Sequence, residues 1–139
     1  MLGLSFSGGK DSLACWYLYR DQNPIVFWVN TGKVYPETLE IVNKIKSEAK
    51  LFVEINVDVQ KNIDDFGLPS DLVPVANTET GMAITGYRPT KIRSYLDCCI
   101  GNIAIPIIDA CKKYGVTRLI RGQRNDESHK ANSKNGDVV

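Results

Sequence analysis

The chain has 139 residues, of which 43% are hydrophobic and 24% charged, and its formal net charge at pH 7 is +1. This length predicts one domain, spanning residues 1–139, with a hydrophobic core of its own. The composition excludes a disordered, collagen-like or low-complexity protein, and the overall charge by itself gives no reason to expect nucleic-acid binding.

Strand-like and helix-like segments alternate along the chain. Short apolar runs predict strands over residues 2–6, 25–29, 51–57 and 117–121. Helical spacing of apolar residues predicts helices over residues 11–20, 36–49 and 98–114. This alternation is typical of an α/β fold, a doubly wound parallel sheet with helices on both faces. Residues 58–95 carry scattered prolines and glycines and fit no regular pattern.

Ligands of such sheets bind outside the carboxyl ends of the strands. Polar, glycine-containing segments follow three of the predicted strands, at residues 7–12, 30–32 and 122–128. We expect these segments to meet at one edge of the sheet. Residues 86–134 also hold ten Lys or Arg and only four Asp or Glu, which favours an anionic ligand.

The first segment, Ser-Phe-Ser-Gly-Gly-Lys-Asp-Ser, joins a strand to a helix. Two adjacent glycines let backbone amides approach a ligand, and the amino end of the following helix favours an anion. The segment is neither a P-loop nor a dinucleotide fingerprint, because the required glycine spacings are missing. It predicts a phosphate site formed by Ser5, Ser7, Gly8, Gly9, Lys10, Asp11 and Ser12.

The other two segments supply further candidates. Asn30-Thr31-Gly32 ends the second strand and can place backbone groups against an adenine or a ribose. Residues 121–128 read Arg-Gly-Gln-Arg-Asn-Asp-Glu-Ser, and the planar guanidinium of an arginine suits bidentate contact with a phosphate or sulfate.

These motifs resemble those of a known family. Residues 7–12 are similar to the PP-loop, S-G-G-x-D-S, of the ATP-pyrophosphatase (adenine nucleotide alpha hydrolase-like, or HUP-like) superfamily. Residues 30–38 resemble the N-T-G-x-x-F-P-E-T segment of the phosphoadenylyl-sulfate (PAPS) reductase family, and residues 122–128 are similar to its G-x-R-x-E-x-S signature. This second resemblance implies that Gly122, Arg124 and Ser128 are site residues. The resemblance implies a domain of the PP-loop type that binds an adenine nucleotide.

For activity, the resemblance implies reduction of an adenylyl sulfate to sulfite by a cysteine nucleophile, which a thioredoxin-like donor then reduces. The Glu-Cys-Gly tail that carries this cysteine in the family does not occur among the 139 residues, so the catalytic residue is unknown. The resemblance covers about the first two-thirds of a typical family member. We therefore expect either a fragment or a short variant.

Two alternatives remain open at this point. The chain could be an ATP pyrophosphatase that adenylates a substrate, for example in nucleic-acid sulfur or base modification, with Asp11 holding Mg²⁺. It could also be a nucleotide-binding module without catalysis. The sequence does not decide whether the nucleotide is PAPS, adenylyl sulfate or ATP, and nucleic acid is an expected partner only under the first alternative.

The cysteines predict reduced thiols rather than a disulfide framework. Cys98 and Cys99 open the predicted helix over residues 98–114. Some reductases of adenylyl sulfate bind a [4Fe–4S] cluster with such a pair and a later C-x-x-C, which this chain lacks. We expect a half-buried structural pair, with Cys15 and Cys111 as small core residues of helices.

Two further expectations concern location and the core. The sequence has neither a signal peptide nor an apolar run of the roughly 18 residues that a membrane span needs, which predicts a cytoplasmic protein without membrane contact. The aromatic residues expected in the hydrophobic core are Trp16, Tyr17, Trp28 and Phe52.

Overall fold

The structure is a computed structural model that describes residues 1–70, 77–86 and 91–123. The chain forms two compact units. The first comprises Met1–Asn56 and the chain from Pro106 onward, and the second comprises Val57–Ile105. That the 139 residues form a single domain stays a prediction, and each unit is described by itself.

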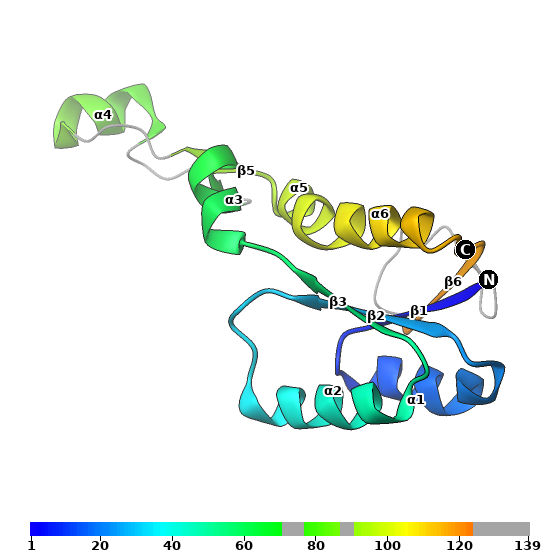
Figure 1. The fold of residues 1–139 in the computed structure, drawn as a ribbon. Coiled ribbons are helices and arrows are strands. Elements are labelled where there is room, and N and C mark those ends of the chain that lie inside the picture. The colour runs from blue at the N-terminus through cyan, green and yellow to red at the C-terminus, as the bar shows by residue number, and fades with distance from the viewer. Residues whose placement is uncertain (71–76, 87–90, 124–139) are drawn as a thin grey trace. The chain divides into compact units, whose positions relative to one another are not determined.

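A four-stranded parallel sheet is the centre of the first unit (Figure 1). Its order is β3-β2-β1-β6, so the first strand lies inside the sheet between the second and the last. All four strands agree with the sequence prediction to within one residue at each end. Their bounds are β1 Leu2–Phe6, β2 Ile25–Asn30, β3 Phe52–Asn56 and β6 Arg118–Arg121.

Helices flank this sheet, which confirms the predicted α/β class (Figure 1). α1 (Lys10–Tyr19) follows β1 and ends in a 3₁₀ turn, η1 (Arg20–Gln22). α2 (Pro36–Glu48) begins with a proline, whose fixed φ suits the first helical position. α6 (Ile105–Lys113) precedes β6.

The hydrophobic core lies mainly between the sheet and the helices α1 and α2. Alternate residues of the strands, among them Leu4 and Val26, are fully buried there. Trp16 of α1 packs with them, as do two side chains of α2, Val42 and Ile45. Apolar residues on one stripe of each helix therefore hold both helices against one face of the sheet.

A thinner layer covers the opposite face. The ring of Phe27, which is fully buried, packs edge-on against Tyr114 with the centroids 6.0 Å apart. Gly3 lies against Val116, which precedes β6, and Leu119, which lies in it. A Cβ added to Gly3 would come within 2.9 Å of the Val116 side chain and 3.3 Å of the Leu119 side chain. The two faces of the sheet thus pack independently.

The second unit contains short elements that the sequence did not predict. α3 (Val59–Phe66) and α4 (Glu79–Thr85) are accompanied by a two-stranded parallel sheet of β4 (Leu68–Pro69) and β5 (Ile92–Arg93). The helix α5 (Tyr95–Cys99) follows, and then one π-helical turn, η3 (Ile100–Ala104). Each α-helix of the unit begins with a side-chain cap, from Asp58, Thr78 and Ser94.

Two sequence expectations are wrong, one in each unit. The helix expected to open at Cys98 begins at Tyr95, because the Ser94 hydroxyl caps the chain by accepting the Asp97 amide. Tyr17, expected in the core, is 42% exposed. Its ring instead lies beneath the guanidinium of Arg20, at 5.3 Å.

Among the described residues, no helix has both the length and the apolar character needed to cross a membrane.

Candidate nucleotide site

Three sequence motifs follow neighbouring strands at the same edge of the sheet. β1 pairs in parallel with β2 on one side and with β6 on the other. The chain runs from β1 outward to β2 and β3 and then returns to β6 across β1. The carboxyl end of β1 is therefore the topological switch point, which is where open α/β sheets bind their ligands.

The loop after β1 is held in shape from within by its own hydroxyl groups. The Ser12 hydroxyl donates to the carbonyl of Gly9 at 2.9 Å and accepts the Ser7 amide at 3.3 Å. The two serine hydroxyls lie 3.2 Å apart. Ser12 is only 4% exposed, so its hydroxyl shapes the loop, while Ser7 and Gly9 stay exposed to solvent.

The loop leads directly into α1, whose amino end has no side-chain cap. The N-cap position is Gly9, and Lys10, the first helical residue, is exposed. Amides in the first turn of a helix have no intrahelical acceptor, and the helix dipole makes this end positive. An exposed lysine beside such an end gives a positively charged surface suited to a phosphate or sulfate.

Gly8 joins the first motif to the second. Its φ is +82°, and a Cβ placed there would lie 2.6 Å from the Thr38 Cγ2 atom. Thr38 belongs to the first turn of α2, two residues after Pro36. The loop after β1 and the start of α2 are therefore in direct contact, and any side chain at position 8 would push them apart.

Gly122 joins the third motif to the first. A Cβ at this position would lie 2.7 Å from the carbonyl carbon of Asp11 and 2.7 Å from the amide nitrogen of Ser12. These are backbone atoms of α1, which cannot move aside as a flexible side chain can. The chain leaving β6 thus passes directly against the start of α1, and only glycine fits there without a shift.

The second motif forms a tight turn after β2. The Asn30 Oδ1 atom accepts the Gly32 amide at 2.9 Å, and φ at Gly32 is +78°. This is an Asx turn, in which a side-chain oxygen replaces a backbone carbonyl. The Asn30 Nδ2 atom donates to Glu54 Oε1 of β3 at 2.9 Å. The amide side chain is therefore held at both ends, and Thr31 lies between, half-buried.

Ser5 and Arg121 lie side by side at the sheet edge. The pairing of β1 with β6 aligns these two residues, and both are on the opposite face of the sheet from Leu4. Ser5 is half-buried and Arg121 exposed. Arg121 is a cation that the sequence analysis left out of the candidate site, although it is the residue immediately before Gly122.

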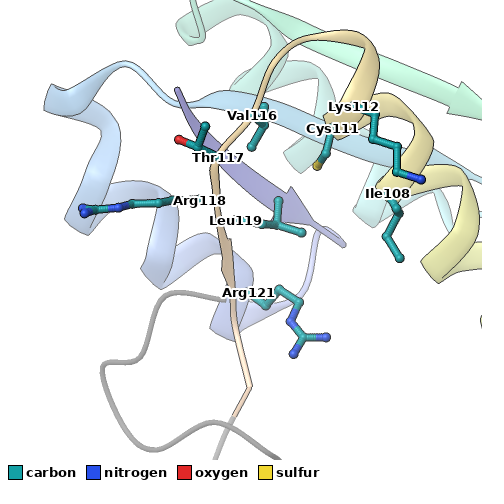
Figure 2. A pocket seen from close by; sticks show the side chains of 8 residues that line it. All are labelled: Ile108, Cys111, Lys112, Val116, Thr117, Arg118, Leu119 and Arg121. Carbon is teal, nitrogen blue, oxygen red and sulfur yellow. The ribbon is translucent and has the colours of Figure 1, made fainter.

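A cavity of about 380 Å³ lies beside Arg121, between α6 and β6 (Figure 2). Apolar side chains and the cations Lys112, Arg118 and Arg121 line it. None of the residues of the loop after β1 is among its lining residues. The cavity is therefore distinct from the loop after β1, and Arg121 lines it while also preceding Gly122 directly in the chain.

Two candidates lie outside the described residues. Arg124 and Ser128 both follow residue 123, the last that the structure describes. Their expected contact with a phosphate or sulfate stays a prediction. Gly122, immediately before them, is the member of this motif whose position the structure gives.

The four cysteines are divided between the two units. Cys15 lies in α1 and Cys111 in α6, whereas Cys98 and Cys99 lie in α5 of the second unit. All four are free and half-buried. Among the described residues no group of three or more Cys, His, Asp or Glu is placed to hold a metal ion.

Two of these thiols have shifted acidity. Burial raises the pKa of Cys15, and the nearby negative charge of Asp11 raises it further. Burial alone raises the pKa of Cys111. Neither environment activates a thiolate nucleophile. Asp11 is half-buried in the first turn of α1, and its role as a Mg²⁺ ligand stays a prediction.

The sequence analysis missed two residues that shape the site. Thr38 was read only as part of a motif at a helix start, and its contact with Gly8 could have been suspected from the position of that motif beside the loop. Glu54 gave no signal, since a single carboxylate in a strand is ordinary and only the register of β2 with β3 brings it to Asn30.

Comparison with known proteins identifies the family of the chain. A sequence model of the Phosphoadenosine phosphosulfate reductase domain matches residues 2–136 of the chain. No individual curated protein matches it. The matched range includes all three motifs and every element of both units.

Proposed function

Because the chain belongs to the phosphoadenosine phosphosulfate reductase domain family, we propose that it binds an adenylyl sulfate at the carboxyl end of β1. The observation that carries this proposal is the convergence of the three motifs. Gly8 is in contact with Thr38, and Gly122 is packed against Asp11 and Ser12. Proteins of the family bind an adenine nucleotide, and these contacts gather its signature segments at one edge.

The loop after β1 and the other two motifs have different roles in this proposal. The amides after Ser7 and the ammonium of Lys10 hold the sulfate or phosphate end of the ligand, with Arg124 as the second cation. Backbone groups of Thr31 and Gly32 contact the adenosine. Charge-assisted hydrogen bonds of this kind are the strongest that a binding site can make, so the anionic end supplies most of the affinity.

Sulfite formation by the family reaction requires a thiolate that attacks the sulfur atom. The bond from sulfur to the nucleotide oxygen then breaks, the nucleotide leaves and the cysteine carries the sulfonate group. A thioredoxin-like dithiol supplies two electrons, which release sulfite and restore the thiol. The half-buried thiols of Cys15 and Cys111 are poor candidates because their pKa values are raised. We propose that the attacking thiol comes from outside these 139 residues.

One observation supports a second candidate function. Asp11 lies in the first turn of α1, beside the loop. A carboxylate in this position can hold a Mg²⁺ ion that is bound to a nucleoside triphosphate. An ATP pyrophosphatase would use this arrangement to release pyrophosphate. The Asn30 turn and the contact of Gly122 with α1 favour the adenylyl sulfate, since these features belong to the two motifs shared with the reductase family.

The test is calorimetric titration of the chain and its variants with PAPS. We expect Lys10→Ala and Arg124→Ala each to weaken binding by about 1.5–3 kcal/mol, the range of hydrogen bonds to charged groups. The matched control is Lys50→Ala, which removes an exposed lysine just before β3, at the opposite edge of the sheet. Unchanged affinity in both site variants, or an equal loss in the control, would refute the proposed site.

A further inference from the structure

Glu54 is the least expected residue near the site. It lies on β3 and aligns with Trp28, while Asn30 aligns with Asn56 two positions further along. Residues two apart on a strand project to the same face. Glu54 and Asn30 therefore share a face on neighbouring strands, and their side chains meet diagonally near the carboxyl ends.

Both carboxylate oxygens of Glu54 are engaged. Oε1 accepts the Asn30 Nδ2 at 2.9 Å, and Oε2 accepts the ammonium of Lys46, from α2, at 3.2 Å. The hydrogen bond from Asn30 is the main cause that lowers the pKa of Glu54, and Lys46 lowers it further. The group is consequently a carboxylate, a pure acceptor, at neutral pH.

A pure acceptor decides which way the Asn30 amide points. An asparagine side chain can rotate to exchange its oxygen and its nitrogen, and its hydrogen-bond partners fix the choice. With a carboxylate on one side, the Nδ2 must face Glu54 and the Oδ1 must face the turn. In that orientation the Oδ1 accepts the Gly32 amide. The reverse orientation would place two donors against each other and open the turn.

We propose that Glu54 is a positioning residue of the nucleotide site. It acts through Asn30, by holding the amide in the orientation that closes the turn over Thr31 and Gly32. This inference rests on the proposed function, in which the backbone of that turn contacts the adenosine. Glu54 itself touches no ligand, and its contribution is to remove the alternative conformation of the turn before binding.

The test compares four single variants by titration with PAPS. Glu54→Ala removes the acceptor. Glu54→Val also removes it but introduces a residue that favours strands, so it serves as the test if the alanine variant folds poorly. Glu54→Gln restores a side-chain oxygen at the same position. Glu48→Ala is the matched control, because Glu48 also accepts one side-chain hydrogen bond, from Trp16 Nε1 at 3.2 Å, at the carboxyl end of α2.

We expect Glu54→Ala and Glu54→Val to weaken PAPS binding about five- to twentyfold, because the hydrogen bond to Asn30 is lost and the turn loosens. Glu54→Gln and Glu48→Ala should bind within about threefold of the unmodified chain. In amide NMR spectra without ligand, the Gly32 resonance should move in the alanine and valine variants and stay near its place in the glutamine variant.

The outcomes separate the two proposals. If the unmodified chain does not bind PAPS, the proposed function fails and this inference fails with it. If the unmodified chain binds and Glu54→Ala and Glu54→Val bind equally well, the proposed function stands and the positioning role is overturned. A Gly32 resonance that stays in place in Glu54→Ala and Glu54→Val would also overturn the role, without reference to any ligand.

Discussion

The two units are stabilised in different ways. Among the described residues, every buried hydrophobic side chain lies in the first unit, from Leu4 to Ile120. The second unit leaves large apolar side chains exposed, among them Phe66 and Leu96. Its helices α3, α4 and α5 have side-chain caps instead, and the helices α1 and α2 of the first unit have none.

This difference bears on how the first unit can bind a ligand. A helix held by a buried face does not depend on a cap for its stability, since packing supplies most of the free energy of helices in proteins. The amino end of α1 can thus face a ligand rather than a capping side chain. Helices with little burial need their caps, and α3, α4 and α5 follow that pattern.

The largest expected effect contrasts two phenylalanines. Phe27 is fully buried in the first unit, whereas Phe66 is 58% exposed in the second. We expect Phe27→Ala to lower the free energy of unfolding by about 3–5 kcal/mol, and Phe66→Ala to lower it by about 1 kcal/mol or less. Urea denaturation of both variants measures the difference. Similar losses would contradict the contrast between the units.

A second prediction concerns the contact between the loop and α2. Gly8→Ala should destabilise the protein by about 2 kcal/mol or more, because a left-handed conformation alone costs an alanine about 1–2 kcal/mol and the new Cβ meets the Thr38 methyl. Thr38→Ser removes that methyl. The double variant should regain the part of the free energy of unfolding that the steric contact costs. It should not regain the part that the left-handed conformation costs.

The control for this cycle is Gly32→Ala. Gly32 has a φ of +78°, yet an added Cβ would have nothing within 4 Å. We expect Gly32→Ala to lower the free energy of unfolding by the conformational cost alone, about 1–2 kcal/mol. Adding Thr38→Ser should not reduce this loss. If Thr38→Ser also fails to reduce the destabilisation caused by Gly8→Ala, the contact between the two motifs is wrong.

A third prediction tests the caps of the second unit. Asp58 accepts the Lys61 amide at 2.9 Å, and Ser94 accepts the Asp97 amide at 3.1 Å. We expect Ser94→Ala and Asp58→Ala each to cost about 1 kcal/mol, detectable as faster amide exchange in their own helices. Ser47→Ala, which removes an exposed hydroxyl inside α2 rather than a cap, should cost less than about 0.5 kcal/mol.

The smallest expected effect is a pH dependence. The pKa of Glu54 is lowered in the folded protein, first by Asn30 and then by Lys46. A carboxyl with a lowered folded-state pKa adds stability above its unfolded-state pKa, about 4.3, and loses it as the pH falls through the folded-state value. The group is partly exposed, so its contribution should stay below about 1 kcal/mol.

Comparison of the unmodified chain with Glu54→Gln at pH 7 and pH 3 measures this contribution. The unmodified chain should be the more stable at pH 7, and the two should converge on acidification. A difference that is the same at both pH values would show that the carboxylate charge does not contribute.

Most of the first unit could be predicted from the sequence. Its strands are short apolar runs, and α2 has regular spacing and a proline at its start. The rule for parallel sheets then places the three motifs at one edge without any knowledge of side chains. The predictions worked here because burial, which leaves a pattern in the sequence, determines these elements.

The second unit gave no such pattern. β4 and β5 have two residues each, too few for any periodicity, and the helices there are set by single capping residues. The start of α5 was misplaced because its cap, Ser94, lies outside the apolar run. Contacts that depend on register, such as that of Glu54 with Asn30, cannot be predicted until the pairing of strands is known.

The central claim is that the three motifs form a site for an adenylyl sulfate. Its most direct test is calorimetric titration of the chain with PAPS and, separately, with Mg-ATP, because binding does not require the attacking thiol. We predict saturable binding of PAPS with clearly higher affinity than that of Mg-ATP. Preference for Mg-ATP would favour the pyrophosphatase, and binding of neither would contradict the site itself.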